Sequence, residues 1–182
     1  PYAKHNPPYG SYGYYIKNTC RLCNSLNLDM VLQLTPTALC DAFSPVIDEP
    51  RVFPLNLCLC NNCGFVQLDC VVDPEEIYKE YIFVTTSSSP LKQHFFDYAD
   101  AVLKSGRLRQ NSLVVDIGSN DGTLLQCFKD KGLRTLGVEP ASKIAALANS
   151  QGLETINSYF DTQVAREIVK SYGFADVITI NN

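Results

Sequence analysis

Residues Val114 to Leu125 read VVDIGSNDGTLL and indicate the fold more clearly than any other segment. An apolar run typical of a buried strand leads into a loop with two glycines, Gly118 and Gly122, and then into a helical pattern that Gly132 closes. Gly118 lets the chain turn sharply beside a ligand, and Gly122 lets the helix begin close to it. Backbone amides at that helix start can donate to polar ligand groups. The stretch therefore predicts a nucleotide-like ligand between the strand and the helix.

Strands and helices alternate around this stretch. The pattern predicts strands over residues 112–118, 134–140 and 175–180, and helices over residues 122–132, 141–152 and 161–173. Strands separated by helices of this length favour an α/β fold with a parallel, doubly wound, Rossmann-like sheet that binds its ligand at the carboxyl ends of the strands. The last strand would be the fourth of such a fold, so we expect the sheet to be incomplete at Asn182 and the chain to be a fragment.

Glu139 ends the second predicted strand, about 20 residues after the glycine loop, where a carboxylate can accept hydrogen bonds from both ribose hydroxyls. A dinucleotide site would continue from Gly118 as G-x-G-x-x-G, but the other two positions hold Asn120 and Thr123. The loop and Glu139 therefore favour an adenosine without a second nucleotide. A solvated strand end is the structural alternative for Glu139. Local loop capping is the alternative for two further acids, Asp116 and Asp121.

Two Cys-x-x-Cys pairs precede this domain. Zinc takes four tetrahedral ligands, and each pair offers two thiolates at a suitable spacing. Asn24 and Gly64 follow the second cysteine of each pair, and both tolerate the left-handed backbone of a tight turn. Zinc is the prediction, with two disulfides or unligated thiols as alternatives and Cys58 as a competitor of Cys60. The predicted ligands are Cys20, Cys23, Cys60 and Cys63.

The chain divides into four parts by composition. Residues 1–17 are rich in Pro, Gly and Tyr and are interpreted as a tail; residues 18–72 show short apolar runs broken by prolines, typical of a small β-rich unit that a metal would stabilise. Residues 73–108 are interpreted as a helical connector and residues 109–182 as the Rossmann-like domain. The connector's longer helix is predicted to have an apolar face of Leu91, Phe95, Tyr98, Ala99 and Val102.

Composition narrows the classes of protein further. The chain has 182 residues, of which 46% are hydrophobic, enough for a packed core. Its net charge of -4 disfavours nucleic acid as a partner. No apolar run reaches the length of a membrane span and no secretory signal is visible, so a cytoplasmic protein is expected. Small buried or half-buried apolar roles are expected for four other cysteines: Cys40, Cys58, Cys70 and Cys127.

Several motifs, in a fixed order, carry a resemblance to a known family. VVDIGSNDGTLL, GVEPA and ADVITINN resemble class I methyltransferases that use S-adenosylmethionine. With the strings that precede them, the set resembles the nucleotide-sugar C-methyltransferase family, which includes C-3′-methyltransferases of deoxysugar biosynthesis. The preceding strings are CRLC, PLNLCLCNNCGFVQL and EYIFVTTSSS.

The resemblance implies that the chain is part of a methyltransferase that C-methylates a nucleotide-linked keto-deoxysugar. It assigns the four predicted cysteine ligands to a structural zinc with no open position. It places Tyr81 and the run Thr85–Ser89 on the segment that approaches the sugar, with a core aromatic beside a polar loop as the alternative. With the loop analysis, it predicts that S-adenosylmethionine is bound by Asp116, Gly118, Ser119, Asn120, Gly122, Glu139, Pro140 and Asn181.

The sequence departs from the family in two respects. The family's Y-x-Y pattern reads Tyr81-Ile82-Phe83, which removes one phenol. The family's C-terminal half, with its general-base histidine, is absent, and His5 and His94 are expected to be solvated or structural. We therefore expect cofactor binding without activity. A zinc-ribbon interaction module joined to a degenerate nucleotide-binding domain is the main alternative, and a nicotinamide-dependent oxidoreductase is a weaker one.

Overall fold

The computed structural model describes residues 12–40, 49–78, 81, 84–85, 89–106 and 108–181. The chain folds into two compact units, residues 1–77 and residues 78–182. The predicted connector does not form a part of its own. Most of its short helix, α1 (Pro74–Tyr78), belongs to the first unit, and its long helix, α2 (Ser89–Lys104), belongs to the second.

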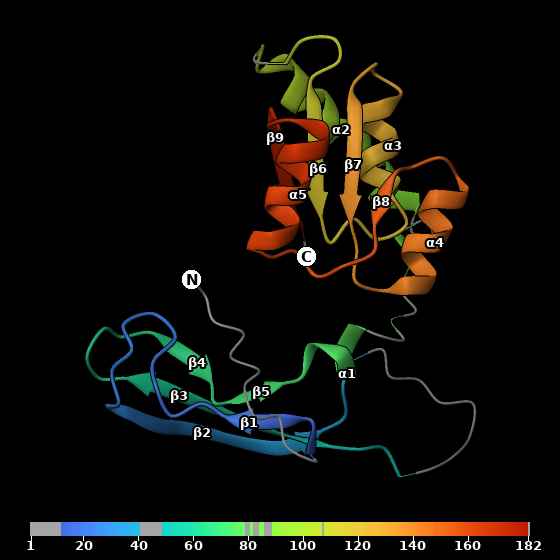
Figure 1. The fold of residues 1–182 in the computed structure, drawn as a ribbon. Coiled ribbons are helices and arrows are strands. Elements are labelled where there is room, and N and C mark those ends of the chain that lie inside the picture. Colours follow the sequence, from blue (N-terminus) through green and yellow to red (C-terminus); the bar gives the residue numbers. More distant parts are fainter. Residues whose placement is uncertain are drawn as a thin grey trace. The chain divides into compact units, whose positions relative to one another are not determined.

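The second unit is built on a four-stranded parallel sheet in the order β8-β7-β6-β9 (Figure 1). Its strands are β6 (Leu113–Ile117), β7 (Arg134–Val138), β8 (Thr155–Ile156) and β9 (Val177–Ile180). The predicted α/β class with a parallel sheet is confirmed, whereas β8 was missed because two residues are too short to give a pattern. The strands β6, β7 and β8 follow one another toward one edge of the sheet, whereas β9 lies on the other side of β6. The carboxyl ends of β6 and β9 therefore form the switch point where such folds bind ligands.

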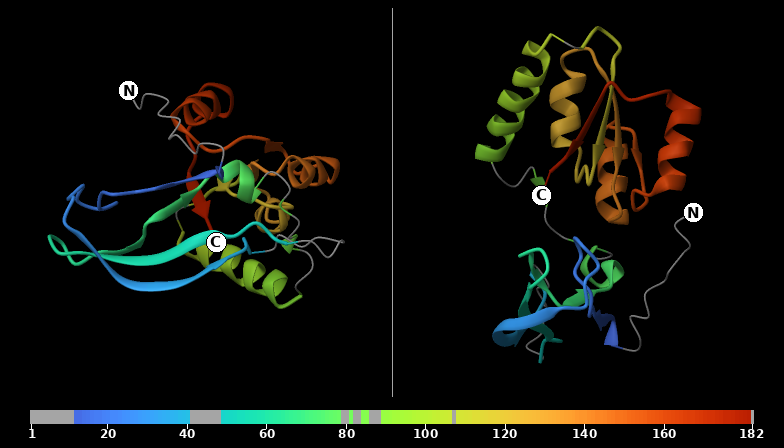
Figure 2. Two further views of the ribbon diagram at one scale, coloured as in Figure 1. Left: turned by 90° about the horizontal axis from the view of Figure 1, so that it is seen from below. Right: turned by 90° about the vertical axis from the view of Figure 1, so that its left-hand side faces the viewer.

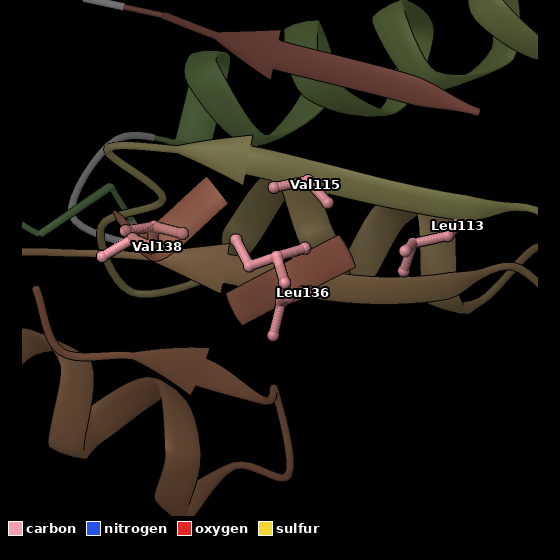
Figure 3. Close-up of a cluster of buried hydrophobic side chains, with 6 residues drawn as sticks. Leu113, Val115, Leu136 and Val138 are labelled. Carbon is pink, nitrogen blue, oxygen red and sulfur yellow. The ribbon is translucent and has the colours of Figure 1, made fainter. Parts of the chain in front are cut away.

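Helices cover both faces of this sheet. One face packs under α5 (Thr162–Tyr172) through Leu113 and Val115 of β6 and through Leu136 and Val138 of β7 (Figure 3). The helices α2 and α3 (Thr123–Lys129) lie on the opposite side from α5 (Figure 2). Burial on both faces explains why Leu113, Val114 and Val115 of β6 form a continuous apolar run.

The opposite face is covered by the helix that the sequence predicted most clearly. Val114 of β6 packs with Leu124 and Phe128 of α3 and with Ala99 of α2. Phe95, Tyr98 and Val102 pack against the same cluster, as the predicted apolar face requires. The remaining helix, α4 (Ser142–Ser150), packs on α3 through Ala148 and Leu125.

The first unit is β-rich, as predicted. It contains a three-stranded antiparallel sheet in the order β2-β3-β4 and an antiparallel pair of β1 and β5. The strands are β1 (Tyr14–Ile16), β2 (Leu28–Thr37), β3 (Phe53–Cys60), β4 (Val66–Leu68) and β5 (Cys70–Val72).

The end of the predicted tail is part of this fold. Tyr14 pairs with Val72 in the β1–β5 ladder, and its ring lies 5.9 Å from that of Phe53. The interpretation of residues 1–17 as a tail is therefore wrong for β1. Three residues among Pro and Gly show no period of their own, so the pairing with β5 supplies the strand.

One face of the three-stranded sheet is lined by aliphatic side chains. Residues directly opposite one another share a face, and the register pairs Leu32 with Leu57, Leu57 with Leu68, and Leu59 with Val66. Leu32, Leu34, Val66 and Leu68 are each between 40% and 50% exposed. Sequence periodicity therefore produces an apolar face here without producing a closed core.

None of the helices in the described part of the chain is both long enough and apolar enough to cross a membrane.

Candidate cofactor and metal sites

The loop after β6 turns sharply, as its glycines predict. Gly118 has a φ of +71°, and its backbone N–H donates to the carbonyl oxygen of Val138 at 2.8 Å. Gly122 has a φ of +79°, and a Cβ there would lie 2.6 Å from a methyl carbon of Leu153. Gly118 therefore serves the turn beside the strand ends, whereas Gly122 lets the start of α3 pack against the chain after α4.

The acid at the end of β7 lies directly against this turn. Glu139 is 5% exposed; its Oε2 accepts from the backbone N–H of Asn120 at 2.9 Å, and its Oε1 accepts from the N–H of Ala141 at 2.8 Å. Each carboxylate oxygen can accept a second hydrogen bond. The carboxylate is thus fixed in orientation and retains acceptor capacity for ligand hydroxyls.

A cavity of about 510 Å³ lies at the carboxyl ends of β6, β7 and β9, within the range typical of small-molecule sites. Tyr81 lines it, as does every predicted cofactor residue except Gly122, which packs against Leu153 instead. The predicted residues that the structure brings to the cavity are Asp116, Gly118, Ser119, Asn120, Glu139, Pro140 and Asn181.

The first unit brings the four predicted cysteine ligands together. Cys20 Sγ lies 3.6 Å from Cys63 Sγ, Cys23 Sγ lies 3.6 Å from Cys60 Sγ, and all four sulfurs lie within 4.8 Å of one another. Four thiolates at about 2.3 Å from one zinc ion stand about 3.8 Å apart. The cysteines are free, so the disulfide alternative is contradicted, and Cys58 lies outside the cluster. The geometry fits a closed tetrahedral zinc site.

The two halves of this cluster are built alike. Asn24 has a φ of +59° and Gly64 a φ of +75°, as predicted, and their N–H groups donate to the carbonyl oxygens of Cys20 and Cys60 at 3.0 and 2.8 Å. Each loop thus presents two sulfurs on one side of a tight turn, the arrangement that suits a tetrahedral metal.

The thiols of the cluster differ in acidity. Hydrogen bonds from the backbone N–H of Ser25 and then from the side chain of Asn62 lower the pKa of Cys23 to about 6. The backbone N–H of Phe65 acts in the same direction on Cys63, but desolvation and the neighbouring thiols raise the pKa of Cys63 to about 12. Metal binding by this set must therefore release protons, which makes it pH-dependent.

Both units have relatives among known proteins. Residues 20–78 match the family Methyltransf_13, described as "Putative zinc binding domain". The C-methyltransferase NovU of Streptomyces niveus is 33% identical over 127 residues, covering 70% of this chain and 30% of NovU. The chain thus spans about 30% of the length of that relative. These matches support a methyltransferase family that uses S-adenosylmethionine.

Solved methyltransferase structures show a more distant similarity. Magnesium protoporphyrin IX methyltransferase (ChlM) from Synechocystis PCC 6803 with bound SAM is 17% identical, with a TM-score of 0.34 and coverage of 37% of this chain and 36% of that chain. The plantazolicin methyltransferase BpumL in complex with SAH is 18% identical, with a TM-score of 0.33 and coverage of 49% and 33%.

The charge of the cavity at the strand ends is negative. Asp116 is 4% exposed, and burial, opposed by a hydrogen bond from Thr179 and supported by the charge of Glu139, raises the pKa of Asp116 to about 6. None of the described residues that line the cavity is a lysine, an arginine or a histidine. Such a surface favours cationic or neutral ligands over phosphates.

Ser119 has a buried hydroxyl with no hydrogen-bond partner among the described residues. Its Oγ lies where a side chain on Gly137 would begin, because a Cβ at Gly137 would be 2.4 Å from it. Buried polar atoms without partners are rare in native proteins and often belong to ligand sites. The hydroxyl is fully buried and lies against the backbone of β7 at Gly137.

The cavity has an aromatic border that the sequence pattern did not predict. Tyr159 and Phe160 follow β8 and line the cavity together with Tyr78 of α1. The ring of Tyr78 lies 6.0 Å from that of Tyr81 and 6.4 Å from that of Tyr159. Two adjacent aromatics in a polar loop between a strand and a helix were the available signal, but it was hidden because β8 itself was not predicted.

The remaining predictions have mixed outcomes. Asp121 makes local hydrogen bonds in the loop, as its alternative interpretation predicts, since its Oδ1 accepts from the N–H and the hydroxyl of Thr123 at 3.2 and 2.6 Å. His94 is exposed and does not line the cavity, while His5 lies outside the described residues. The other four cysteines were expected to be buried or half-buried, which is confirmed for Cys58, Cys70 and Cys127 and wrong for Cys40, which is exposed.

Proposed function

We propose that this chain is part of an S-adenosylmethionine-dependent C-methyltransferase that acts on a nucleotide-linked keto-deoxysugar. The observation that carries the proposal is the Glu139 carboxylate, held against the Asn120 amide at the carboxyl ends of β6 and β7. A carboxylate in this position of a Rossmann-like fold accepts the hydroxyls of a ribose. The absence of basic residues among the described cavity lining favours a cofactor without phosphates over a dinucleotide.

The residues of the cavity divide the work of binding. Glu139 would hold the ribose, and Asp116 would favour the positive charge of the cofactor. S-adenosylmethionine supplies a methyl group on a positively charged sulfur. The protein's contribution to such a transfer is to align donor and acceptor and to exclude water. Tyr78, Tyr81 and Tyr159 give the cavity an aromatic side suited to that exclusion.

The substrate class is supported by the similarity to the C-methyltransferase NovU and by the motif order described above. A sugar carbon beside a ketone must lose a proton before it can attack a methyl group, which requires a positioned base. No histidine is found among the described residues that line the cavity. We therefore propose that this chain binds the cofactor but does not turn over a sugar by itself. The zinc cluster would serve as a structural element because its four positions are filled by thiolates.

The test is a calorimetric titration of the zinc-loaded chain with S-adenosylhomocysteine. We expect saturable binding, and Glu139→Gln should weaken it by about 10- to 100-fold, because hydrogen bonds to a charged acceptor contribute about 1.5–3 kcal/mol. Glu154→Gln is a matched control, since Glu154 accepts from the Tyr172 hydroxyl on the exposed surface at 2.6 Å and does not line the cavity.

Two outcomes would contradict the proposal. One is a folded, zinc-loaded chain that ignores S-adenosylhomocysteine at millimolar concentration. The other is saturation by NAD, which would revive the oxidoreductase interpretation in spite of the cavity's charge.

A further inference from the structure

Asn120 makes hydrogen bonds with two other residues that line the cavity, Glu139 and Thr85. Its backbone N–H donates to Glu139 Oε2 at 2.9 Å. Its side-chain Oδ1 accepts from the backbone N–H of Thr85 at 2.9 Å and from the Thr85 hydroxyl at 3.2 Å. The same oxygen accepts from the N–H of Asp121 at 2.9 Å. A single residue therefore joins the acid at the end of β7 to the chain segment that precedes α2.

The backbone of Asn120 is adapted to this double role. Its φ of +50° is uncommon for a residue other than glycine, although asparagine tolerates it better than most. This conformation allows the amide to face Glu139 while the side chain reaches Thr85. Glycine would keep the turn, but it would lose the acceptor for Thr85.

Thr85 follows Tyr81 by four residues and lines the same cavity as the aromatic residues. Thr85 is 6% exposed and lines the cavity together with Tyr81. Tyr81 contacts Tyr78, which contacts Tyr159 on the loop after β8. The hydrogen bonds of Asn120 thus provide a polar attachment between the glycine turn and the segment that carries Tyr81 and Thr85.

We propose that Asn120 is a positioning residue that couples cofactor binding to the placement of the aromatic border. The inference rests on the proposed function, because it takes Glu139 to be the group that holds the cofactor. A ligand that fixes Glu139 also fixes the amide of Asn120, and the Asn120 side chain then holds Thr85 more firmly. Such coupling requires that the ligand binds better when these bonds are made, and the effect is reciprocal.

The Thr85 amide reports this coupling directly, because its exchange with solvent requires the bond to Asn120 to open. The experiment is amide hydrogen exchange of the full chain, followed by NMR, with and without S-adenosylhomocysteine. We expect saturating ligand to slow exchange at Thr85 by at least about fivefold, the scale of one hydrogen bond. The Thr123 amide, which donates to Asp121 rather than to Asn120, is the internal control.

Two variants separate coupling from a merely structural role. In Asn120→Gly, S-adenosylhomocysteine should still bind, about fivefold more weakly, but it should no longer slow exchange at Thr85. Thr85→Val keeps the N–H and removes only the hydroxyl bond, so it should retain part of the effect, and it keeps the test available if Asn120→Gly does not fold. A structural role alone would give equal Thr85 exchange with and without ligand.

The outcomes distinguish the two proposals. If S-adenosylhomocysteine binds and Thr85 exchange does not change in the wild type, or changes equally in Asn120→Gly, the coupling is refuted and the proposed function stands. If S-adenosylhomocysteine does not bind, the proposed function fails and the coupling fails with it.

Discussion

The two units of this chain differ in how much apolar surface they bury. The α/β unit buries apolar side chains on both faces of its sheet, and Val114, Leu136 and Phe128 are each 0% exposed. The first unit has a sheet of similar size, but one of its faces carries leucines and valines that remain half exposed. Among its described residues, the side chains buried completely are those of Cys20 and Cys60, two of the predicted metal ligands.

This difference shows where the core of the first unit lies. Burial of apolar surface contributes about 25 cal/mol for each Å² to the free energy of folding. A sheet face that stays half exposed therefore supplies only part of the stabilisation that full burial would give. The two short cysteine loops place four thiols within 4.8 Å of one another, and a metal ion bound there can supply the remaining folding free energy. We infer that the metal cluster replaces a closed hydrophobic core in the first unit, whereas the second unit needs no such replacement.

Metal removal should have the largest effect on stability, and it should act on the first unit alone. Chelation should unfold the first unit, because zinc binding to such sites contributes of the order of 10 kcal/mol to folding. Hydrogen exchange, read separately for β3 and for β6, should show loss of protection in β3 alone. Equal protection of β3 with and without chelator would show that the apolar face suffices.

Two neighbouring cysteines of β3 provide matched variants for the same test. Cys60→Ala should reproduce the effect of chelation, since Cys60 belongs to the cluster. Cys58→Ala should retain the metal, because Cys58 is 7% exposed but lies outside the cluster. Loss of metal from both variants would contradict the assignment of ligands.

A core substitution in the second unit should give the converse result. Leu136→Ala removes a fully buried side chain from the cluster under α5 and should lower the free energy of unfolding of this unit by about 2–5 kcal/mol. Urea unfolding followed by the exchange of β6 amides measures it, and zinc content should not change. Phe174→Ala is the control, since Phe174 is 83% exposed and its loss should cost less than about 0.5 kcal/mol.

How far the fold could be predicted from sequence also differs between the units. In the α/β unit, long periodic segments predicted β6, β7, β9 and the helices α2, α3, α4 and α5, because each is dominated by its own buried face. In the first unit the strand β1 was missed, because its three residues depend on pairing with β5 rather than on a local pattern. The four cysteines were predictable because metal spacing is a local property of the chain.

The cavity residues, too, were predictable where a local pattern places them and not where pairing between distant segments does. Residues of the glycine loop and Glu139 were found from spacing along one βαβ unit. Tyr159 and Phe160 were not found, because their place on the cavity depends on β8, a strand of two residues held by pairing with β7. Gly122 was assigned to the ligand, but it packs against Leu153, a contact between distant segments that spacing does not reveal.

The raised pKa of Asp116 should make the stability of the second unit depend on pH. Its pKa is raised to about 6, so the native state holds a proton that the unfolded state releases near pH 4. The contribution to stability is therefore complete below about pH 4 and is lost as pH rises through about 6, an effect of about 3 kcal/mol. Urea unfolding of the second unit should show this loss.

The variant Asp116→Asn isolates this effect from other titrating groups. Its stability, compared with that of the wild type, should increase as pH rises from about 4 to 7, because asparagine avoids burying a charge. Its affinity for S-adenosylmethionine at pH 7 should fall, since a negative charge beside a cationic ligand is removed. A difference in stability that does not depend on pH would show that Asp116 is ionised throughout this range.

A substitution of Gln67 should have the smallest effect, and it tests whether the metal alone holds the first cysteine loop in place. Gln67 is 4% exposed; its Oε1 accepts from the N–H of Arg21 at 2.7 Å, and its Nε2 donates to the carbonyl oxygen of Thr19 at 3.1 Å. Gln67→Met keeps the volume but removes both bonds to the first cysteine loop. Zinc affinity, measured by competition with a chromogenic chelator, should fall about tenfold, as when a group that orients metal ligands is lost.

Leu68→Ala is the control for this last prediction, because Leu68 lies on the opposite, half-exposed face of the same strand. If zinc affinity is unchanged in Gln67→Met, the cysteine loops are positioned by their own backbone bonds and the metal alone. If affinity falls in Gln67→Met and not in Leu68→Ala, the first unit possesses a small preorganised core, in which a buried amide orients the loop before the metal binds.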